Sequence, residues 1–297
     1  MNRYSDQYFS YRILLLLLLL PACNVFLRAQ QGQGQEWLDL SFTYIDGNKL
    51  DSAEYALKKY LEKDPGGPLN PFVLNNLATI QRRLGKRDEA LLSYTAALGT
   101  YPKNTVFLAS RAALFAETGK PANAIADYTA LLDEKPQDEE ALYQRGLLYL
   151  QMRNTDLAEA DFNRMLAVNP DGLYPRMGLA SLAKFRGDYD DAEKIYNYLI
   201  DKEPEMPGLY AGRAEVYLLA DKPGKASADA TRALRFYGQA YHEPYLYIIR
   251  CKAKLLLREK KAALEDLEKA VALGYDPEEA AVIRKAAGEG EKEKEKD

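Results

Sequence analysis

The chain has 297 residues, of which 47 % are hydrophobic and 28 % are charged, and its formal net charge is −4. This balance is typical of a globular protein, and it excludes the strongly basic composition that is typical of nucleic-acid-binding proteins.

The first 29 residues have the pattern of an export signal. Arg3 and Arg12 precede an unbroken aliphatic run from Ile13 to Leu20. This run is too short to span a membrane as a permanent helix, but its length is typical of the apolar part of a signal peptide. The pattern therefore predicts a protein that is exported from the cytoplasm, in the periplasm or cell envelope of a bacterium.

Two cleavage sites compete at the end of this segment. Cleavage after Ala29 would give an ordinary signal peptide over residues 1–29, because a small residue stands before the cut. Alternatively, the sequence LPAC at residues 20–23 resembles a bacterial lipobox, which would end the signal at residue 22 and make Cys23 the lipidated first residue. A retained anchor is the third interpretation. All three predict export, and membrane contact of the mature chain is expected only if Cys23 is lipidated.

A polar spacer, QQGQGQ at residues 30–35, leads into an internal repeat. Each repeat has the spacing of two short amphipathic helices joined by a tight turn, and neither helix is long enough to be stable alone in water. Four consecutive spacings are 34 residues, and two are three residues longer. Seven repeats are predicted, at residues 34–67, 71–104, 105–138, 139–172, 173–206, 207–240 and 244–277.

Two columns of small residues recur through the repeats. Counting from the first residue of each repeat, position 8 holds Ser41, Ala78, Ala112, Gly146, Ala180, Ala214 and Cys251. Position 20 is alanine throughout, at Ala53, Ala90, Ala124, Ala158, Ala192, Ala226 and Ala263. Because two helices approach closely only where side chains are small, these columns predict where the first helix of each repeat crosses the second. The spacing thus predicts paired helices stacked in series.

The repeats closely resemble the tetratricopeptide repeat (TPR) family. The 34-residue period, the small residues at positions 8 and 20 and the proline at position 32 of five repeats agree with its pattern, and Trp37 matches its tryptophan. The resemblance covers residues 34–277. It implies an all-α, right-handed α-solenoid, with a concave groove lined mainly by positions 2, 5, 6, 9 and 12 of the first helices.

Groove positions in the TPR family bind protein or peptide segments, so the resemblance nominates candidate peptide-binding residues. Side-chain amides suit a peptide backbone, and tyrosine, methionine and leucine offer apolar contacts. The candidates are Asn75, Asn76, Thr79, Arg82, Tyr143, Gln144, Leu147, Tyr174, Met177 and Ser181. The alternative interpretation is that some of these residues pack against the first helix of the next repeat. The carboxylate clamp of chaperone-binding members is not reproduced, because Leu38 and Phe42 stand where it needs lysine and asparagine.

Four repeats carry arginine at position 7, and the same four carry aspartate at position 23. Where position 7 is leucine instead, at Leu40, Leu77 and Leu179, position 23 has no charge. Charge at both positions or at neither predicts an Arg–Asp pair between the two helices of one repeat, because a partly buried guanidinium needs a carboxylate. We interpret these pairs as structural. They are Arg111 with Asp127, Arg145 with Asp161, Arg213 with Asp229, and Arg250 with Asp266.

No catalytic, metal-binding or cofactor-binding motif is found in the sequence. The single histidine, His242, has no cluster of further ligands at metal-binding spacing. Phosphate-binding and dinucleotide-binding glycine motifs are also missing. Cys251 occupies a small-residue column, which predicts a buried, unpaired thiol. We therefore expect a protein that is not an enzyme, with no metal, no cofactor and no disulfide.

The last predicted elements are a capping helix over residues 278–287 and a tail over residues 288–297 whose charges alternate. Asp276 and Pro277 form a typical helix start, and the helix would cover the end of the stack. The tail is predicted to be disordered, because it has no apolar residue.

Together these observations predict an exported scaffold. We expect it to bind a protein or peptide segment in its groove and to assist the assembly or retention of a cell-envelope complex. One alternative is that the groove binds a glycan or cell-wall fragment, with Tyr143 and Tyr174 stacking on sugar rings. Another is a structural protein that associates with itself.

Overall fold

The computed structural model describes residues 34–238 and 244–288, and these residues form helices joined by short turns, with no strand among them. Several predictions concern residues outside these ranges and stay predictions. They are the export signal over residues 1–29, Cys23, most of the polar spacer, His242 and the tail from residue 289.

The chain forms two compact units, whose boundary in the sequence lies between Leu148 and Tyr149. The first unit contains α3 (Gln35–Asp46), α4 (Leu50–Lys63), α5 (Asn70–Arg83), α6 (Arg87–Thr100), α7 (Thr105–Glu117) and α8 (Pro121–Glu134). The boundary falls within α9 (Glu139–Gln151). The second unit contains α10 (Thr155–Val168), α11 (Leu173–Arg186), α12 (Tyr189–Lys202), α13 (Pro207–Leu219), α14 (Pro223–Tyr237), α15 (Tyr245–Leu256), α16 (Lys260–Ala272) and α17 (Pro277–Ala286).

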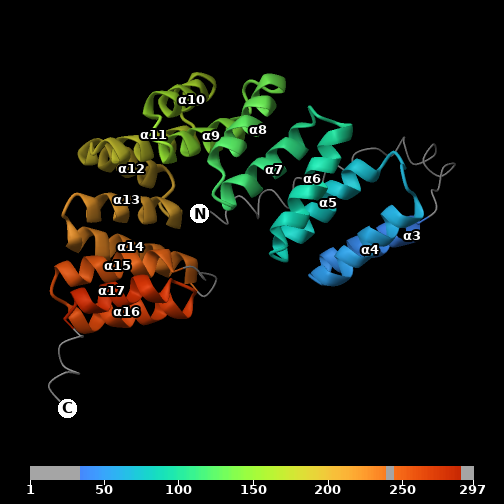
Figure 1. The fold of residues 1–297 in the computed structure, drawn as a ribbon. Coiled ribbons are helices and arrows are strands. Elements are labelled where there is room, and N and C mark those ends of the chain that lie inside the picture. Colours follow the sequence, from blue (N-terminus) through green and yellow to red (C-terminus); the bar gives the residue numbers. More distant parts are fainter. Residues whose placement is uncertain (1–33, 239–243, 289–297) are drawn as a thin grey trace, which may run out of the picture. The chain divides into compact units, whose positions relative to one another are not determined.

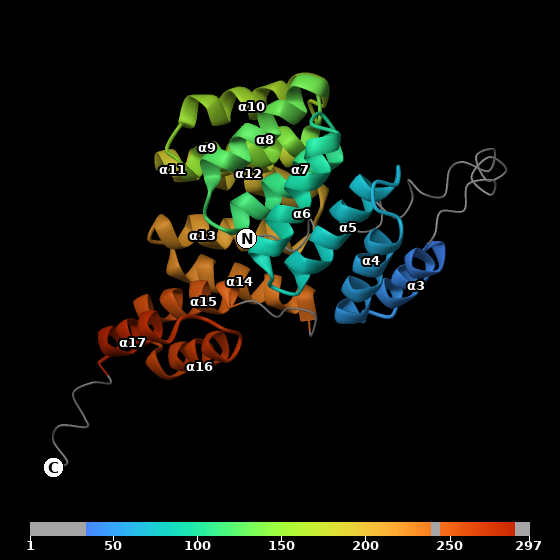
Figure 2. The same cartoon turned by 45° about the vertical axis from the view of Figure 1, so that its right-hand side comes forward.

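From α3 to α8 in the first unit and from α10 to α17 in the second, each helix packs against the next one in the sequence (Figures 1 and 2). The odd-numbered helices from α3 to α15 are the first helices of the predicted repeats, and we call them A helices; the even-numbered ones from α4 to α16 are the B helices. A helices of neighbouring repeats also touch, since α5 contacts α7 and α13 contacts α15. Paired helices stacked in series, as the spacing predicts, make this an all-α repeat fold of the solenoid class.

The two small-residue columns form the contact between the A and B helices. All seven alanines at position 20 are fully buried, and the residues at position 8 are buried as well. Large side chains at position 24, such as Tyr94 and Phe162, are completely enclosed between the helices. The buried apolar side chains of each unit form several clusters, and each cluster is shared by neighbouring helices.

Local sequence signals set the ends of several helices. The Asn104 side chain accepts hydrogen bonds from the backbone N–H groups of Val106 and Phe107, which caps α7. At the end of α11, Gly187 has a φ of +84°, a left-handed conformation that favours glycine. Asp276 caps α17 in the same way as Asn104 caps α7. This last helix buries Ala280 against the seventh repeat and begins one residue before the predicted start.

Candidate functional site

In the first unit, the predicted groove residues lie along one side of α5. Asn76, Thr79 and Arg82 are half-buried, and each follows the previous one by about one helical turn. The Thr79 hydroxyl lies 3.0 Å from the hydroxyl of Tyr94, and Arg82 forms an ion pair of 2.9 Å with Glu117 of α7. This side of α5 is therefore polar, partly accessible and tied to the A helix of the next repeat.

Asn75 does not lie on this accessible surface. Only 3 % of the residue is exposed, so its amide cannot reach a bound peptide as the sequence predicted. Its Oδ1 atom is buried without a hydrogen-bond partner among the described residues. Position 5 is covered because it turns toward the packed interior, whereas position 6 remains partly accessible at Asn76.

Tyr143 on α9 is also buried, with 9 % exposure. A sugar ring needs an exposed aromatic face for stacking, so Tyr143 cannot serve the glycan interpretation in the way proposed for it. Gln144 and Leu147 on the same helix are half-buried and remain partly accessible.

In the second unit, α11 presents the exposed side chain of Tyr174 and the half-buried side chains of Met177 and Ser181. Met177 packs against the main apolar core of this unit, so it supports the helix as well as facing its surface. Gly178 lies between them, and a Cβ atom at this position would stand 2.4 Å from the ring of Phe162. The close approach of α10 to α11 therefore depends on glycine at this position.

A polar bridge joins three A helices of the second unit, and the sequence reasoning missed two of its members. Lys184 of α11 and the hydroxyl of Tyr245 of α15 both donate to Oε2 of Glu215 on α13, at 2.6 and 2.8 Å. Glu215 and Tyr245 occupy groove positions 9 and 2 of their repeats. Tabulating these positions in the sixth and seventh repeats would have found both residues.

Bidentate Arg–Asp contacts join the A and B helices of three repeats. In the third repeat, Arg111 donates from Nε and Nη2 to the two carboxylate oxygens of Asp127, each at 2.8 Å. The same arrangement joins Arg213 to Asp229 and Arg250 to Asp266. Arg145 and Asp161 belong to different compact units, so their pairing stays a prediction.

Each of these four arginines also reaches the preceding repeat. Nη1 donates to a hydroxyl or amide oxygen at position 25 of the previous B helix, a contact that the sequence analysis did not predict. The pairs are Arg111 with Thr95, Arg145 with Thr129, Arg213 with Asn197, and Arg250 with Thr231. Since each acceptor is threonine or asparagine at the same position, the sequence contained the signal. The guanidinium groups are thus satisfied inside the stack, which supports a structural role.

The chemistry available at the predicted groove positions is that of binding. No group of three histidine, cysteine, aspartate or glutamate side chains within residues 34–238 and 244–288 could hold a metal ion. In the same ranges, no helix has the length and apolar character needed to cross a membrane. Exposed aromatic rings, hydroxyls and amides can form apolar contacts and hydrogen bonds with a partner.

Comparisons with known proteins agree with this geometry. Profiles described as "Tetratricopeptide repeat" match residues 75–139, 139–171 and 177–241. A FAM10 family protein of Arabidopsis thaliana is 32 % identical over 108 residues, which are 36 % of this chain and 24 % of that protein. The chain therefore spans about a quarter of the length of this curated relative.

Solved structures extend the similarity over most of the chain. A tetratricopeptide repeat protein from Parabacteroides merdae is 42 % identical, with a TM-score of 0.79 over 86 % of this chain and 98 % of that one. PilW, described as a widely conserved type IV pilus biogenesis factor, has a TM-score of 0.57 over 72 % of this chain and 98 % of its own, at 19 % identity. The second likeness shows the fold alone. From the matched repeats and the packing of its helices, the chain belongs to the tetratricopeptide repeat family.

Proposed function

We propose that this protein is an exported scaffold that binds a protein or peptide segment along its A helices, and that it assists the assembly or retention of a cell-envelope complex. Tetratricopeptide repeat proteins generally bind protein partners. The observation that carries the proposal is a recurring exposed aromatic residue at groove position 2. Phe72, Tyr174 and Tyr245 are each between 44 % and 45 % exposed.

Exposed aromatic rings at a repeated position are suited to binding, because aromatic side chains supply much of the energy at protein interfaces. Tyr245 is held in place by its hydrogen bond to Glu215, and Phe72 by ring contacts with Tyr101 and Phe107. A ring that is already held loses little conformational freedom when a partner binds. Polar groups beside the rings, such as Asn76 and Ser181, can bond to a partner's backbone.

Export is supported by the aliphatic run at Ile13–Leu20 and its flanking arginines. The envelope role follows from export together with partner binding. Burial of Tyr143 removes one of the two rings on which the glycan interpretation depended, so a protein or peptide segment is the better-supported partner.

The test is affinity capture with the full chain, tagged at its C-terminus and expressed in its native host. The binding variant carries Phe72→Ala, Tyr174→Ala and Tyr245→Ala. Its matched control carries Leu92→Ala and Leu157→Ala, which remove exposed apolar side chains from B helices instead. Circular dichroism spectra and melting temperatures establish that both variants fold.

The proposal expects one or more envelope proteins to copurify with the wild type and the control but to be lost from the binding variant. If both variants retain the same proteins, the A-helix surface is not the binding site. If no protein copurifies and light scattering shows a mass that rises with concentration, self-association becomes the better account.

A further inference from the structure

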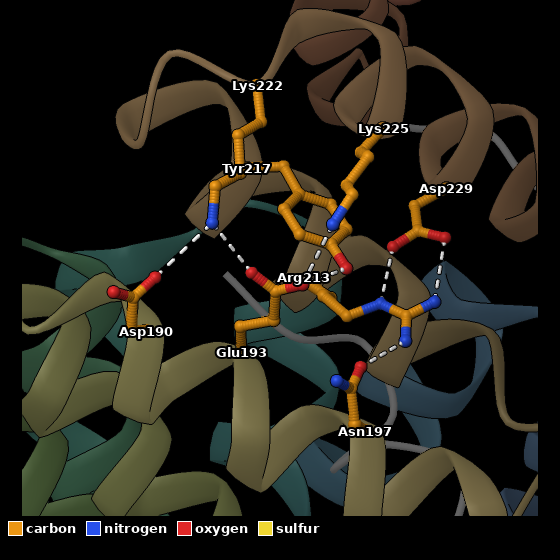
Figure 3. A network of polar contacts seen from close by, with 8 residues as sticks. All are labelled: Asp190, Glu193, Asn197, Arg213, Tyr217, Lys222, Lys225 and Asp229. Atoms are coloured by element: carbon orange, nitrogen blue, oxygen red, sulfur yellow. Dashed lines mark hydrogen bonds and ion pairs between the residues drawn. The ribbon is translucent and has the colours of Figure 1, made fainter.

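The Glu193 carboxylate on α12 accepts hydrogen bonds from several side chains of the following repeat (Figure 3). Its Oε1 accepts hydrogen bonds from the hydroxyl of Tyr217, at 2.9 Å, and from Nζ of Lys225, at 3.1 Å. Its Oε2 accepts from Nζ of Lys222 at 2.9 Å. We call these four residues the Glu193 cluster. One side chain of the fifth repeat thereby contacts both helices of the sixth.

Two residues of the cluster, Tyr217 and Lys222, lie on either side of the turn between α13 and α14. The backbone N–H of Lys222 donates to the carbonyl of Tyr217 at 2.8 Å, which closes the turn between α13 and α14. Lys222 also contacts Asp190, one turn before Glu193 on α12, at 3.3 Å. The turn that carries Lys222 therefore contacts two carboxylates of α12, those of Asp190 and Glu193.

A second copy of the arrangement occurs in the first unit. Glu54 on α4 accepts from Lys86 at 2.6 Å and from Gln81 at 3.5 Å, and the backbone N–H of Lys86 donates to the carbonyl of Gln81 at 2.9 Å. The glutamate and lysine are 32 residues apart here and 29 in the Glu193 cluster, since the first repeat is three residues longer. Equivalent positions of successive repeats are thus brought together in both units where one carries glutamate and the other lysine.

The junction between the sixth and seventh repeats lacks this arrangement. Ser227 stands at the position equivalent to Glu193, and Glu259 at the position equivalent to Lys222. The carboxylate contact to the following turn is therefore a property of particular junctions rather than of the fold as a whole.

We propose that the Glu193 cluster couples α12 to α13 and α14, so that breaking it lets helices α13 to α17, the C-terminal block, unfold more readily while the rest of the second unit stays folded. The Glu193 side chain is only 17 % exposed, so its hydrogen bonds to Tyr217 and Lys222 are partly sheltered from water, whereas its contact with Lys225 is exposed. Hydrogen bonds from Lys222, together with those from Lys225 and Tyr217, lower the pKa of Glu193 to about 2. The carboxylate is accordingly charged, and its contacts are intact, throughout the physiological pH range.

Amide hydrogen exchange of the full chain, followed by mass spectrometry of peptic peptides, tests this coupling. Glu193→Gln keeps the shape of the side chain but removes its charge. We expect exchange in peptides from α13 to α16 to become about tenfold faster or more, while peptides from α10 to α12 change much less. Asp191→Asn is the control on the same helix, since it also removes one negative charge, but from an exposed side chain that pairs with Lys194 of α12 itself.

Cys251 on α15 supplies an independent reporter within the same block. Its thiol is fully buried among α15, α16 and α17, and burial raises its pKa to about 11, so it reacts with alkylating reagents only when the C-terminal block unfolds. Peptide mapping separates its labelling from that of Cys23. Glu193→Gln should accelerate the labelling of Cys251, whereas Glu54→Gln, which disrupts the equivalent site in the first unit, should not.

Two outcomes would overturn the inference. One is that Glu193→Gln changes neither the exchange of α13 to α16 nor the labelling of Cys251. The other is that it accelerates exchange equally in every helix of the second unit, which would indicate general destabilisation. If Glu193→Gln does not fold, the milder Lys225→Met removes one donor, and the same block should respond to a smaller extent.

Discussion

Arg213 donates from Nη1 to the amide oxygen of Asn197 at 2.6 Å, and it thereby binds the B helix of the preceding repeat. Its other two donors hold Asp229 on the B helix of its own repeat, at 2.6 and 3.0 Å. One guanidinium group thus connects α12, α13 and α14. Figure 3 shows this contact beside the Glu193 cluster, so two separate polar contacts join the fifth repeat to the sixth.

The aspartate of this pair is the first target for mutation. Asp229→Ala should lower the free energy of unfolding by roughly 3 kcal/mol, because it leaves a largely buried guanidinium without its carboxylate. The double variant Arg213→Leu with Asp229→Ile copies the natural Leu179–Ile195 combination of the fifth repeat, and it should recover most of that loss. Urea unfolding measures both. A double variant no more stable than Asp229→Ala would show that the pair is not the cause.

The hydrogen bond between Arg213 and Asn197 of the preceding repeat can be tested separately. Asn197→Ala should lower the free energy of unfolding by about 1.5 kcal/mol, as expected for a hydrogen bond to a charged donor. Asn163→Ala is the matched control, since this asparagine occupies the same position before a repeat that carries Leu179 in place of arginine. Equal effects of the two substitutions in urea unfolding would contradict the assigned role of Asn197.

Acid should weaken the Glu193 cluster in a defined pH range. The pKa of Glu193 in the folded protein is about 2, well below its ordinary value of 4.5, chiefly because Lys222 donates to it. A lowered pKa stabilises the fold above pH 4.5, and this contribution is lost as the pH falls from 4.5 to about 2. Lys222, Lys225 and Tyr217 face the carboxylate. The hydrogen bond to Glu193 raises the pKa of Lys222, and burial raises the pKa of Tyr217 to about 12, so these two groups stay protonated in this interval.

The difference in melting temperature between wild type and Glu193→Gln measures this contribution. It should be largest at pH 5 to 7 and should shrink steadily toward pH 2. A difference that stays constant across this range would mean that the charge of Glu193 does not stabilise the fold.

Replacing two glycines of the second unit by alanine should change the free energy of unfolding in opposite directions. Gly212→Ala would place a Cβ atom 2.3 Å from the hydroxyl of Tyr196, so it should destabilise the protein by about 1 to 3 kcal/mol through overpacking. Gly208→Ala meets no atom within 4 Å, and it should stabilise α13 by about 0.5 to 1 kcal/mol, because alanine favours the helix. Thermal unfolding of the two single variants measures the change in melting temperature. If both variants change it in the same direction, this account is contradicted.

The repeat pattern of the sequence predicted the fold well, because seven repeats sample the same positions. Ala90 and its equivalents recur at the helix crossing and are all buried, and Asp276 begins the last helix as predicted. The Arg111–Asp127 contact follows from two columns that change together. Periodicity identifies which positions share a helix face. It also identifies which two positions within one repeat carry opposite charges together.

Contacts between repeats were harder to predict from the same pattern. The exposure of Asn75 and Tyr143 depends on how closely the neighbouring helices approach, and spacing along one helix does not set that distance. Asn197 and Glu193 were missed because their partners belong to the following repeat, whereas the columns were compared within single repeats. Comparing position 25 of each repeat with position 7 of the following repeat would have paired Asn197 with Arg213.

The three-helix contacts of Arg111, Arg213 and Arg250 have a consequence for how such an array can be rearranged. A repeat that carries arginine at position 7 needs threonine or asparagine at position 25 of whichever repeat precedes it, as Thr231 precedes Arg250. Transplanting the seventh repeat behind the first would place its arginine beside Lys58, which offers a second positive charge in place of an acceptor. The order of modules in a shuffled or shortened chain is therefore constrained by one polar residue on the upstream neighbour.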